Sequence, residues 1–198
     1  MTTSTENPEK NQDRVFDLFE MFEKHKQIMF HQQLKIYNRL ASEVKGKTVL
    51  ELGCGTGLGT AIMGRAAKSI IGTDKGENNI KFAQVTYPWI PFYVVDLNYA
   101  YSYSADVVVC VEALEHVTNV QFALKTMLHA ANEKVWVSTP NGNGKKRPPE
   151  NPYHVQEYTV PEMLALLKGY SVIVRTWDTW EEVNVHTKVD PLVYEVLK

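Results

Sequence analysis

Four closely spaced glycines follow a short apolar run and precede a predicted helix. The segment Val49–Gly59 reads V-L-E-L-G-C-G-T-G-L-G, with glycine at every second position from Gly53. Glycine tolerates positive φ and lets a ligand approach the main chain without a Cβ in the way. The unpaired N–H groups at the start of the helix would attract a polar ligand. This loop therefore predicts a cofactor site built largely from backbone.

The spacing of these glycines differs from two other nucleotide-binding patterns. The dinucleotide fingerprint G-x-G-x-x-G would need glycine at position 58, where this chain has Leu58. A phosphate-binding loop would need a Gly-Lys-Ser/Thr sequence, which does not follow. Instead a carboxylate, Glu51, precedes Gly53 with one residue between them. A nicotinamide oxidoreductase remains an alternative, but the pattern favours another cofactor.

Two further carboxylates end the next two predicted strands. Asp74 stands 21 positions after Gly53, and Asp96 ends the following apolar run. Ligands of open α/β sheets bind at the carboxyl ends of the strands, where an acid on the second strand can accept ribose hydroxyls. Asp106 begins a strand, far from that edge, and we assign it a structural role. With Glu51, three acids at three successive strand ends predict a ligand that contains a ribose.

The segment after the fourth predicted strand carries ionisable groups. Glu112, Glu115 and His116 stand at positions i, i+3 and i+4, so a helical turn would place them on one face. Two carboxylates and an imidazole on one face can serve as a general base or as metal ligands. The residues alone leave both alternatives open.

The elements that must position these residues alternate along the chain. Short apolar runs rich in Val and Ile suit a mostly parallel sheet covered by helices. The predicted strands are 48–52, 69–73, 92–95, 106–111, 134–138, 171–177 and 192–196, and the predicted helices between them are 77–86, 119–131 and 161–167. Capping boxes are predicted at Thr118-x-x-Gln121 and Thr159-x-x-Glu162. The fold class is therefore α/β, with a doubly wound, mostly parallel sheet.

The region before the sheet divides into a leader and two helices. Residues 1–12 are polar and predict a disordered leader. Apolar residues then recur at helical spacing over 15–22 and again over 30–44. We expect a single domain over 13–198, with a helical cap at 13–46 and the sheet-containing core at 47–198.

Composition limits the classes of protein to consider. A chain of 198 residues with 44% hydrophobic residues can bury one core, and its net charge of -2 gives no general reason to expect a polyanionic partner. Cys54 and Cys110 lie in apolar segments, which argues against a disulfide framework and for a reducing compartment. Because no signal peptide or membrane-spanning run is visible, we expect a cytoplasmic protein.

Together these motifs resemble those of class I S-adenosylmethionine-dependent methyltransferases, from about Leu40 to the C-terminus. The resemblance implies a seven-stranded Rossmann-like sheet whose last strand is antiparallel, and S-adenosylmethionine as cofactor. The glycines would pack against the methionine part, Asp74 would bind the ribose, and Asp96 with the Leu97 backbone would hold the adenine. The cofactor-binding residues so implied are Glu51, Gly53, Gly55, Gly57, Asp74, Asp96, Leu97 and Val111.

The E-x-x-E-H segment resembles that of ubiquinone-pathway O-methyltransferases and that of metal-dependent 2′-O-methyltransferases of small-RNA 3′ ends. In the second group a histidine after the fifth strand completes a metal site, and His154 follows the fifth strand here. The resemblance thus implies a divalent metal, Mg, Mn or Zn, held by Glu112, Glu115, His116 and His154. Alternatively, His116 is a catalytic base that Glu115 orients, without a metal.

We expect methyl transfer to an oxygen of a small molecule, such as a phenol, a sugar or a quinone precursor. The alternatives are 2′-O-methylation of RNA ends, for which no RNA-binding module is visible, and a cofactor-binding module without turnover. Tyr153, Tyr158 and Trp136 could sandwich a planar acceptor, although aromatic residues usually pack in a core. The basic residues 145–147 could receive an anionic group, but a solvated loop is the favoured interpretation. The N-terminal helices would cap the cofactor. An N-P-Y sequence at 151–153 lies after the fifth strand, not the fourth, which disfavours amino methylation of DNA.

Overall fold

A computed structural model describes residues 24–99, 102–143, 148–149 and 151–198, and the side chains from Met29 onward within these ranges. The predicted leader, the helix predicted over 15–22 and the basic residues 145–147 lie outside the described residues. Among the described residues, no helix combines the length and apolarity needed to cross a bilayer.

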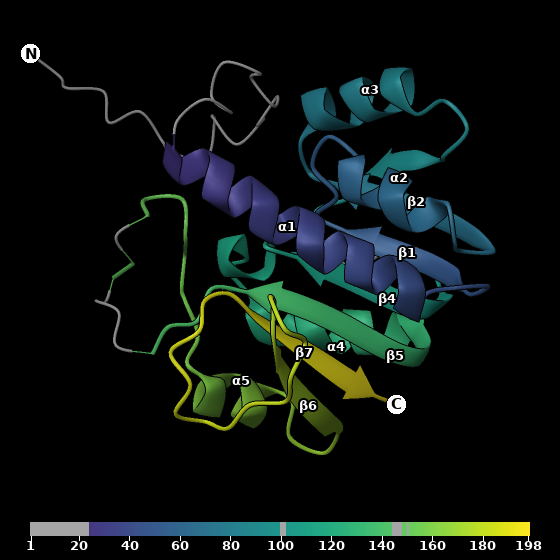
Figure 1. The fold of residues 1–198 in the computed structure, drawn as a ribbon. Coiled ribbons are helices and arrows are strands. Elements are labelled where there is room, and N and C mark those ends of the chain that lie inside the picture. The colour runs from purple at the N-terminus through teal and green to yellow at the C-terminus, as the bar shows by residue number, and fades with distance from the viewer. Residues whose placement is uncertain (1–23, 100–101, 144–147, 150) are drawn as a thin grey trace, which may run out of the picture.

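Seven strands form one sheet in the order β3-β2-β1-β4-β5-β7-β6 (Figure 1). All neighbouring pairs are parallel except those that involve β7, which runs antiparallel to both β5 and β6. The predicted mostly parallel sheet with an antiparallel last strand is therefore confirmed. The strands are β1 (Thr48–Leu52), β2 (Ser69–Asp74), β3 (Phe92–Val94), β4 (Ala105–Val111), β5 (Ala131–Thr139), β6 (Ser171–Thr176) and β7 (Leu192–Leu197).

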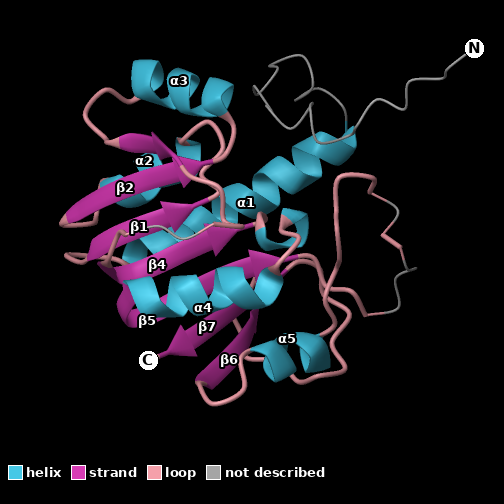
Figure 2. Cartoon of the chain, turned by 180° about the vertical axis from the view of Figure 1, so that it is seen from behind, coloured by secondary structure: helices cyan, strands magenta, loops and turns pink. Residues whose placement is uncertain are grey.

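Helices cover both faces of this sheet. The helices are α1 (Lys24–Glu43), α2 (Leu58–Gly64), α3 (Glu77–Thr86), α4 (Val120–Ala130) and α5 (Val160–Leu166), with a short 3-10 helix at Leu114–His116. Helices α1 and α2 lie over one face, and α4 and α5 lie over the other (Figures 1 and 2). The two faces hold separate buried clusters, since side chains alternate along a strand.

This alternation decides where Glu51 points. Within β1, Val49 packs in the cluster beneath α1 and α2, while Leu50 and Leu52 pack in the cluster on the opposite face. Glu51 is two residues from Val49, so its side chain faces the α1–α2 layer. A carboxylate is thus placed among apolar side chains, under the glycine-rich loop.

The order in which the chain adds strands to the sheet reverses between β1 and β4. From β1 the strands proceed outward to β2 and β3, and the chain then returns to place β4 on the other side of β1. Such a switch point leaves a crevice at the carboxyl ends of the two central strands, where ligands of these folds bind. The glycine-rich loop follows β1 and the E-x-x-E-H segment follows β4, so the topology brings them together.

One of the two predicted capping boxes is wrong. Helix α4 begins after Asn119, whose Oδ1 accepts a hydrogen bond from the Phe122 N–H at 3.1 Å. The Thr118 hydroxyl instead donates to Asn98 Oδ1 at 2.7 Å, so a tertiary contact draws it away from the helix start. The box at Thr159 and Glu162 is confirmed, with both reciprocal hydrogen bonds present at the start of α5.

Candidate functional site

The glycine-rich loop adopts a conformation that side-chain-bearing residues rarely take. Gly53, Gly55 and Gly57 have φ of 75°, 52° and 84°. A Cβ on Gly53 would also lie 2.4 Å from the Ala113 Cβ, in the segment after β4. The loop therefore needs glycine for its own backbone and for the close approach of the neighbouring strand end. The backbone of this loop lines the crevice without side chains at its glycines.

Asp74 holds this loop in place from the end of β2. Its Oδ2 accepts a hydrogen bond from the Gly55 N–H at 2.9 Å, and its Oδ1 accepts from the Gly76 N–H at 2.8 Å. The amide of Asn79, on α3, donates to the same Oδ1 at 3.3 Å. The carboxylate thus links the ends of β1 and β2 while it faces the crevice.

Asp96 is part of a second polar network. Its Oδ1 accepts from the backbone N–H and the side-chain amide of Asn98, both at 2.9 Å. Asn98 Oδ1 in turn accepts from the backbone and hydroxyl of Thr118 at 3.1 and 2.7 Å. Leu97, between these polar residues, is buried. The loop after β3 is thereby fixed against the segment that begins α4.

A pocket opens at the carboxyl ends of the central strands. It is lined by the glycine-rich loop, the ends of β2 and β4, the loop after β3, and helix α1. Of the predicted cofactor residues, the pocket-lining set includes Gly53, Gly55, Asp74, Asp96, Leu97 and Val111, but neither Glu51 nor Gly57. Lining residues that the sequence reasoning did not single out include Phe30, Gln33, Tyr37, Lys75, Asn79 and Asn98.

Tyr37 joins helix α1 to the glycine-rich loop. Its ring packs against Gly59, where an added Cβ would lie 2.1 to 2.5 Å from three ring atoms. Both residues line the pocket, and Tyr37 is almost completely buried. The fourth glycine of the motif is thus explained by the close packing of an aromatic ring.

We expect Gly59→Ala to destabilise the protein by about 1–3 kcal/mol, because the methyl group overpacks this contact. Urea denaturation measures the loss. The matched control is the same substitution in a Tyr37→Ala background, where the ring is gone and the added methyl group should cost little. An equal cost in both backgrounds would mean that the ring contact does not explain this glycine.

Glu51 is fully buried beneath the loop. The Thr60 hydroxyl, on α2, donates to its Oε2 at 2.5 Å. Burial raises the pKa of Glu51 to about 7, although hydrogen bonds from the hydroxyls of Thr60 and Tyr37 partly oppose this rise. Because Glu51 does not line the pocket, we infer that it supports the glycine-rich loop through its contact with α2 and does not touch the ligand.

The raised pKa of Glu51 makes stability depend on pH. An unfolded glutamate loses its proton near 4.5, whereas the folded protein keeps it until about 7. The stabilisation is therefore present below pH of about 4.5, falls as the pH rises through this window, and is lost above about 7. The shift corresponds to about 3 kcal/mol at 1.36 kcal/mol per pKa unit.

Glu51→Gln should therefore reduce the loss of unfolding free energy between pH 5 and pH 8 by up to about 3 kcal/mol. Chemical denaturation at the two pH values measures it, with the exposed Glu77→Gln as control. The pKa of Glu115 is also raised by burial, so part of the decrease of stability with pH should remain in this variant. If the unfolding free energy changed equally with pH in Glu51→Gln and in the native protein, the raised pKa of Glu51 would be contradicted.

The segment after β4 does not form the helical face predicted for it. Glu112 has a positive φ of 50°, and the 3-10 helix begins only at Leu114. The Glu112 backbone N–H and Oε1 are instead hydrogen-bonded to Ser138 of β5, at 2.9 and 2.5 Å. The expected i, i+3, i+4 face is wrong because β5 holds Glu112 apart from the turn.

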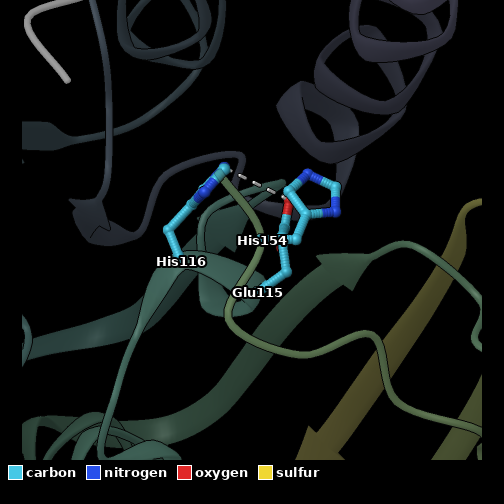
Figure 3. Close-up of side chains that lie close together, drawn as sticks. All are labelled: Glu115, His116 and His154. Carbon is cyan, nitrogen blue, oxygen red and sulfur yellow. Dashed lines mark ion pairs between the residues drawn. The ribbon is translucent and has the colours of Figure 1, made fainter. Parts of the chain in front are cut away.

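Three of the four predicted metal ligands nevertheless lie together. One ligand atom each from Glu115, His116 and His154 fall within 4.8 Å of one another (Figure 3). Glu112 lines the pocket but is not a member of this group. Figure 3 shows the three side chains converging from the 3-10 helix and from the loop after β5.

Glu115 and His116 are each held by further contacts. Glu115 is buried and its Oε2 accepts from the Thr139 hydroxyl at 3.1 Å. Burial, with the nearby Glu112 carboxylate, raises the pKa of Glu115 well above its ordinary value. His116 Nε2 lies 3.8 Å from Glu115 Oε1, beyond hydrogen-bonding distance, while its Nδ1 is 2.8 Å from the Tyr153 carbonyl oxygen. The Tyr153 carbonyl oxygen is therefore a closer partner of His116 than the Glu115 carboxylate is.

Only one of the three predicted acceptor-binding aromatic residues reaches the pocket. Tyr153 lines it and is partly exposed. Trp136 is buried beneath α1 with its ring 5.4 Å from that of Trp180, and Tyr158 is buried in the cluster on the other face. The aromatic sandwich is therefore wrong for Trp136 and Tyr158, and the alternative that aromatic residues pack in the core holds for both.

Comparisons with known proteins find relatives of this chain in both sequence and structure. A family model described as "Methyltransferase domain" matches residues 25–178. A protein of Mycolicibacterium smegmatis named "Probable S-adenosylmethionine-dependent methyltransferase" is 31% identical over 157 residues, which are 72% of this chain and 59% of that protein. The ubiquinone biosynthesis O-methyltransferase of Bordetella avium is 30% identical over 124 residues, 57% of this chain and 51% of that protein.

A solved structure shares the fold. The TehB-like SAM-dependent methyltransferase of Corynebacterium glutamicum superposes with a TM-score of 0.67 at 18% identity, covering 82% of this chain and 87% of that one. Against the curated relatives, in contrast, the chain spans only 59% and 51% of their lengths.

Proposed function

This chain belongs to the methyltransferase-domain family of class I S-adenosylmethionine-dependent enzymes, and we propose that it transfers a methyl group to an oxygen of a small-molecule acceptor. The observation that carries the proposal is the pocket in which a glycine-rich backbone, a strand-end carboxylate and an imidazole meet. The relatives named as ubiquinone biosynthesis O-methyltransferases support oxygen as the accepting atom.

The residues around the pocket fit S-adenosylmethionine. Gly53 and Gly55 offer main chain without side chains at the position proposed for the methionine part. Asp74 faces the pocket, and its two oxygens can together accept four hydrogen bonds. The Gly55 and Gly76 N–H groups take two of these, so two ribose hydroxyls can be accepted once the ribose displaces the 3.3 Å contact from the Asn79 amide. Asp96 and Leu97 would hold the adenine. When bound, the cofactor supplies an electrophilic sulfonium methyl, so the protein's main contribution is alignment of the acceptor.

His116 is the proposed base for the acceptor hydroxyl. The Tyr153 carbonyl can only accept a hydrogen bond, so the neutral imidazole carries its proton on Nδ1. The lone pair then lies on Nε2, and His116 is a pocket-lining residue. Removing the acceptor proton there would raise the nucleophilicity of the oxygen as the methyl transfers.

A divalent cation is the alternative to His116 as base, because the His116 Nε2 lone pair can either accept a proton or ligate a cation. Glu115, His116 and His154 offer one oxygen and two nitrogen donors within 4.8 Å, a donor set that suits Mn²⁺ or Zn²⁺ and, less well, Mg²⁺. A cation at this place would polarise the acceptor oxygen and lower its pKa. The same cluster favours, as second candidate function, the metal-dependent 2′-O-methylation of RNA ends.

We propose a cytoplasmic location for this activity. Cys54 and Cys110 are both free and buried, which suits a reducing compartment.

A methyl-transfer assay tests the proposed function. Labelled S-adenosylmethionine is incubated with the protein and with fractionated metabolites or small RNAs, with and without a chelator. We expect label in a metabolite fraction together with S-adenosylhomocysteine. Label in RNA 3′ ends that the chelator abolishes would favour the second candidate. Cofactor binding without transfer to any fraction would instead indicate a binding module without turnover.

A further inference from the structure

The loop after β5 is attached directly to the turn that carries His116. The backbone N–H groups of Val155 and Gln156 both donate to the Glu115 carbonyl, at 2.8 and 3.3 Å. His116 Nδ1 donates in the opposite direction, to the Tyr153 carbonyl at 2.8 Å. These contacts fix residues 153–156 against the 3-10 helix. His154 is therefore held in one position opposite His116, with ring centres 4.9 Å apart.

Both ring nitrogens of His154 have defined hydrogen-bond partners. Nδ1 lies 2.7 Å from Glu157 Oε1, and Nε2 lies 2.9 Å from the amide nitrogen of Asn151. The Glu157 carboxylate only accepts, so His154 Nδ1 carries a proton. Asn151 uses its oxygen to accept from the Tyr153 N–H at 3.0 Å, which turns its NH₂ group toward His154. Both contacts therefore select the same neutral tautomer, with the lone pair on Nε2.

His154 and Glu157 are close to fully buried, at 9% and 10% side-chain exposure. A hydrogen bond to a carboxylate in such a place is short and charge-assisted, and it competes little with water. In metal sites, a carboxylate on the far nitrogen of a ligating histidine orients the ring and raises its basicity. Glu157 has this relation to His154, although it is not itself part of the three-residue cluster.

We propose that Glu157 and Asn151 are positioning residues that act on His154 with opposite effects on cation binding. Glu157 holds the imidazole in the ligating tautomer and so strengthens binding. Asn151 donates to the Nε2 lone pair that a cation would require, and so weakens it. This inference rests on the cation site included in the proposed function.

The affinity for Mn²⁺ alone, measured by electron paramagnetic resonance or calorimetry, tests the inference without an activity assay. Glu157→Ala should weaken binding by about 10- to 100-fold. Glu157→Gln should weaken it less, because the amide oxygen still accepts from Nδ1. Asn151→Ser should tighten it, because a serine oxygen can keep the turn contact to the Tyr153 N–H while the NH₂ group that competes for the Nε2 lone pair is removed. The exposed Glu181→Ala is the matched control and should change nothing.

The tautomer itself is a second readout that needs no metal. Long-range ¹⁵N–¹H correlation spectra of the native protein should show His154 protonated on Nδ1, and Glu157→Ala should lose this preference while His116 keeps it. Unchanged Mn²⁺ affinity in Glu157→Ala, or no saturable Mn²⁺ binding by the native protein, overturns the inference. S-adenosylmethionine affinity, measured on the same samples, separates this outcome from failure of the methyltransferase assignment.

Discussion

Replacing Asp74 with alanine is expected to lower the affinity for S-adenosylmethionine by about 100-fold or more. Two hydrogen bonds from ribose hydroxyls to a carboxylate contribute about 1.5–3 kcal/mol each, and 1.4 kcal/mol corresponds to a factor of ten in affinity. The carboxylate also accepts from the Gly55 and Gly76 N–H groups, so its removal should loosen the glycine-rich loop. Isothermal titration with S-adenosylmethionine or S-adenosylhomocysteine measures the change.

Two further variants make this result interpretable. Asp74→Asn keeps the shape and one acceptor oxygen, and it should fall between the native protein and alanine. Asp178→Asn removes an exposed carboxylate whose Oδ1 accepts from the adjacent Thr179 N–H, and it should bind normally. Circular dichroism checks that each variant is folded. Native affinity in folded Asp74→Ala would mean that the ribose is bound elsewhere.

Replacing His116 with alanine is expected to leave cofactor affinity nearly unchanged and to reduce turnover by about 10²- to 10⁴-fold. A positioned general base typically contributes a factor of this size. Because the proposed role of His116 is toward the acceptor, the loss should appear in kcat more than in cofactor binding. Single-turnover transfer from labelled S-adenosylmethionine, with an acceptor identified in the fractionation assay, measures it.

The matched control is His129→Ala, because His129 is exposed near the end of α4. That variant should show native turnover. An equal effect of the two substitutions, or a His116→Ala protein that loses cofactor affinity with its activity, would contradict the assignment of His116 as a base.

The fold and the meeting of the glycine-rich loop with Asp74 could be predicted because their signals are local. Strand β1 and helix α3 begin and end at the predicted residues. Their bounds could be predicted because the apolar periodicity and the Gly or Asp residues that mark the ends of such elements are visible in the local sequence. Gly53 and Asp74 stand at fixed positions relative to these strands. Their convergence follows from parallel strand order alone.

The segment after β4 depends on contacts with distant parts of the chain, and there the predictions from the sequence were wrong. Glu112 was expected on a helical face, but Ser138 of β5 holds it in a positive-φ conformation. Thr118 was expected to cap α4, but Asn98 draws its hydroxyl away. Tyr37 was not predicted as a site residue, because its contact with Gly59 joins two helices that are distant in sequence. Glu157 was not predicted either, because no local pattern reveals the orientation of the His154 ring that it contacts. A D-x-N turn at Asp96 was the one available signal for Asn98.

A crystal structure with S-adenosylhomocysteine would test the proposed cofactor site most directly. We expect electron density along the glycine-rich loop, with the ribose hydroxyls bonded to Asp74 and the sulfur directed toward His116. Density for the ligand at another surface, or a ribose held by groups other than Asp74, would contradict it.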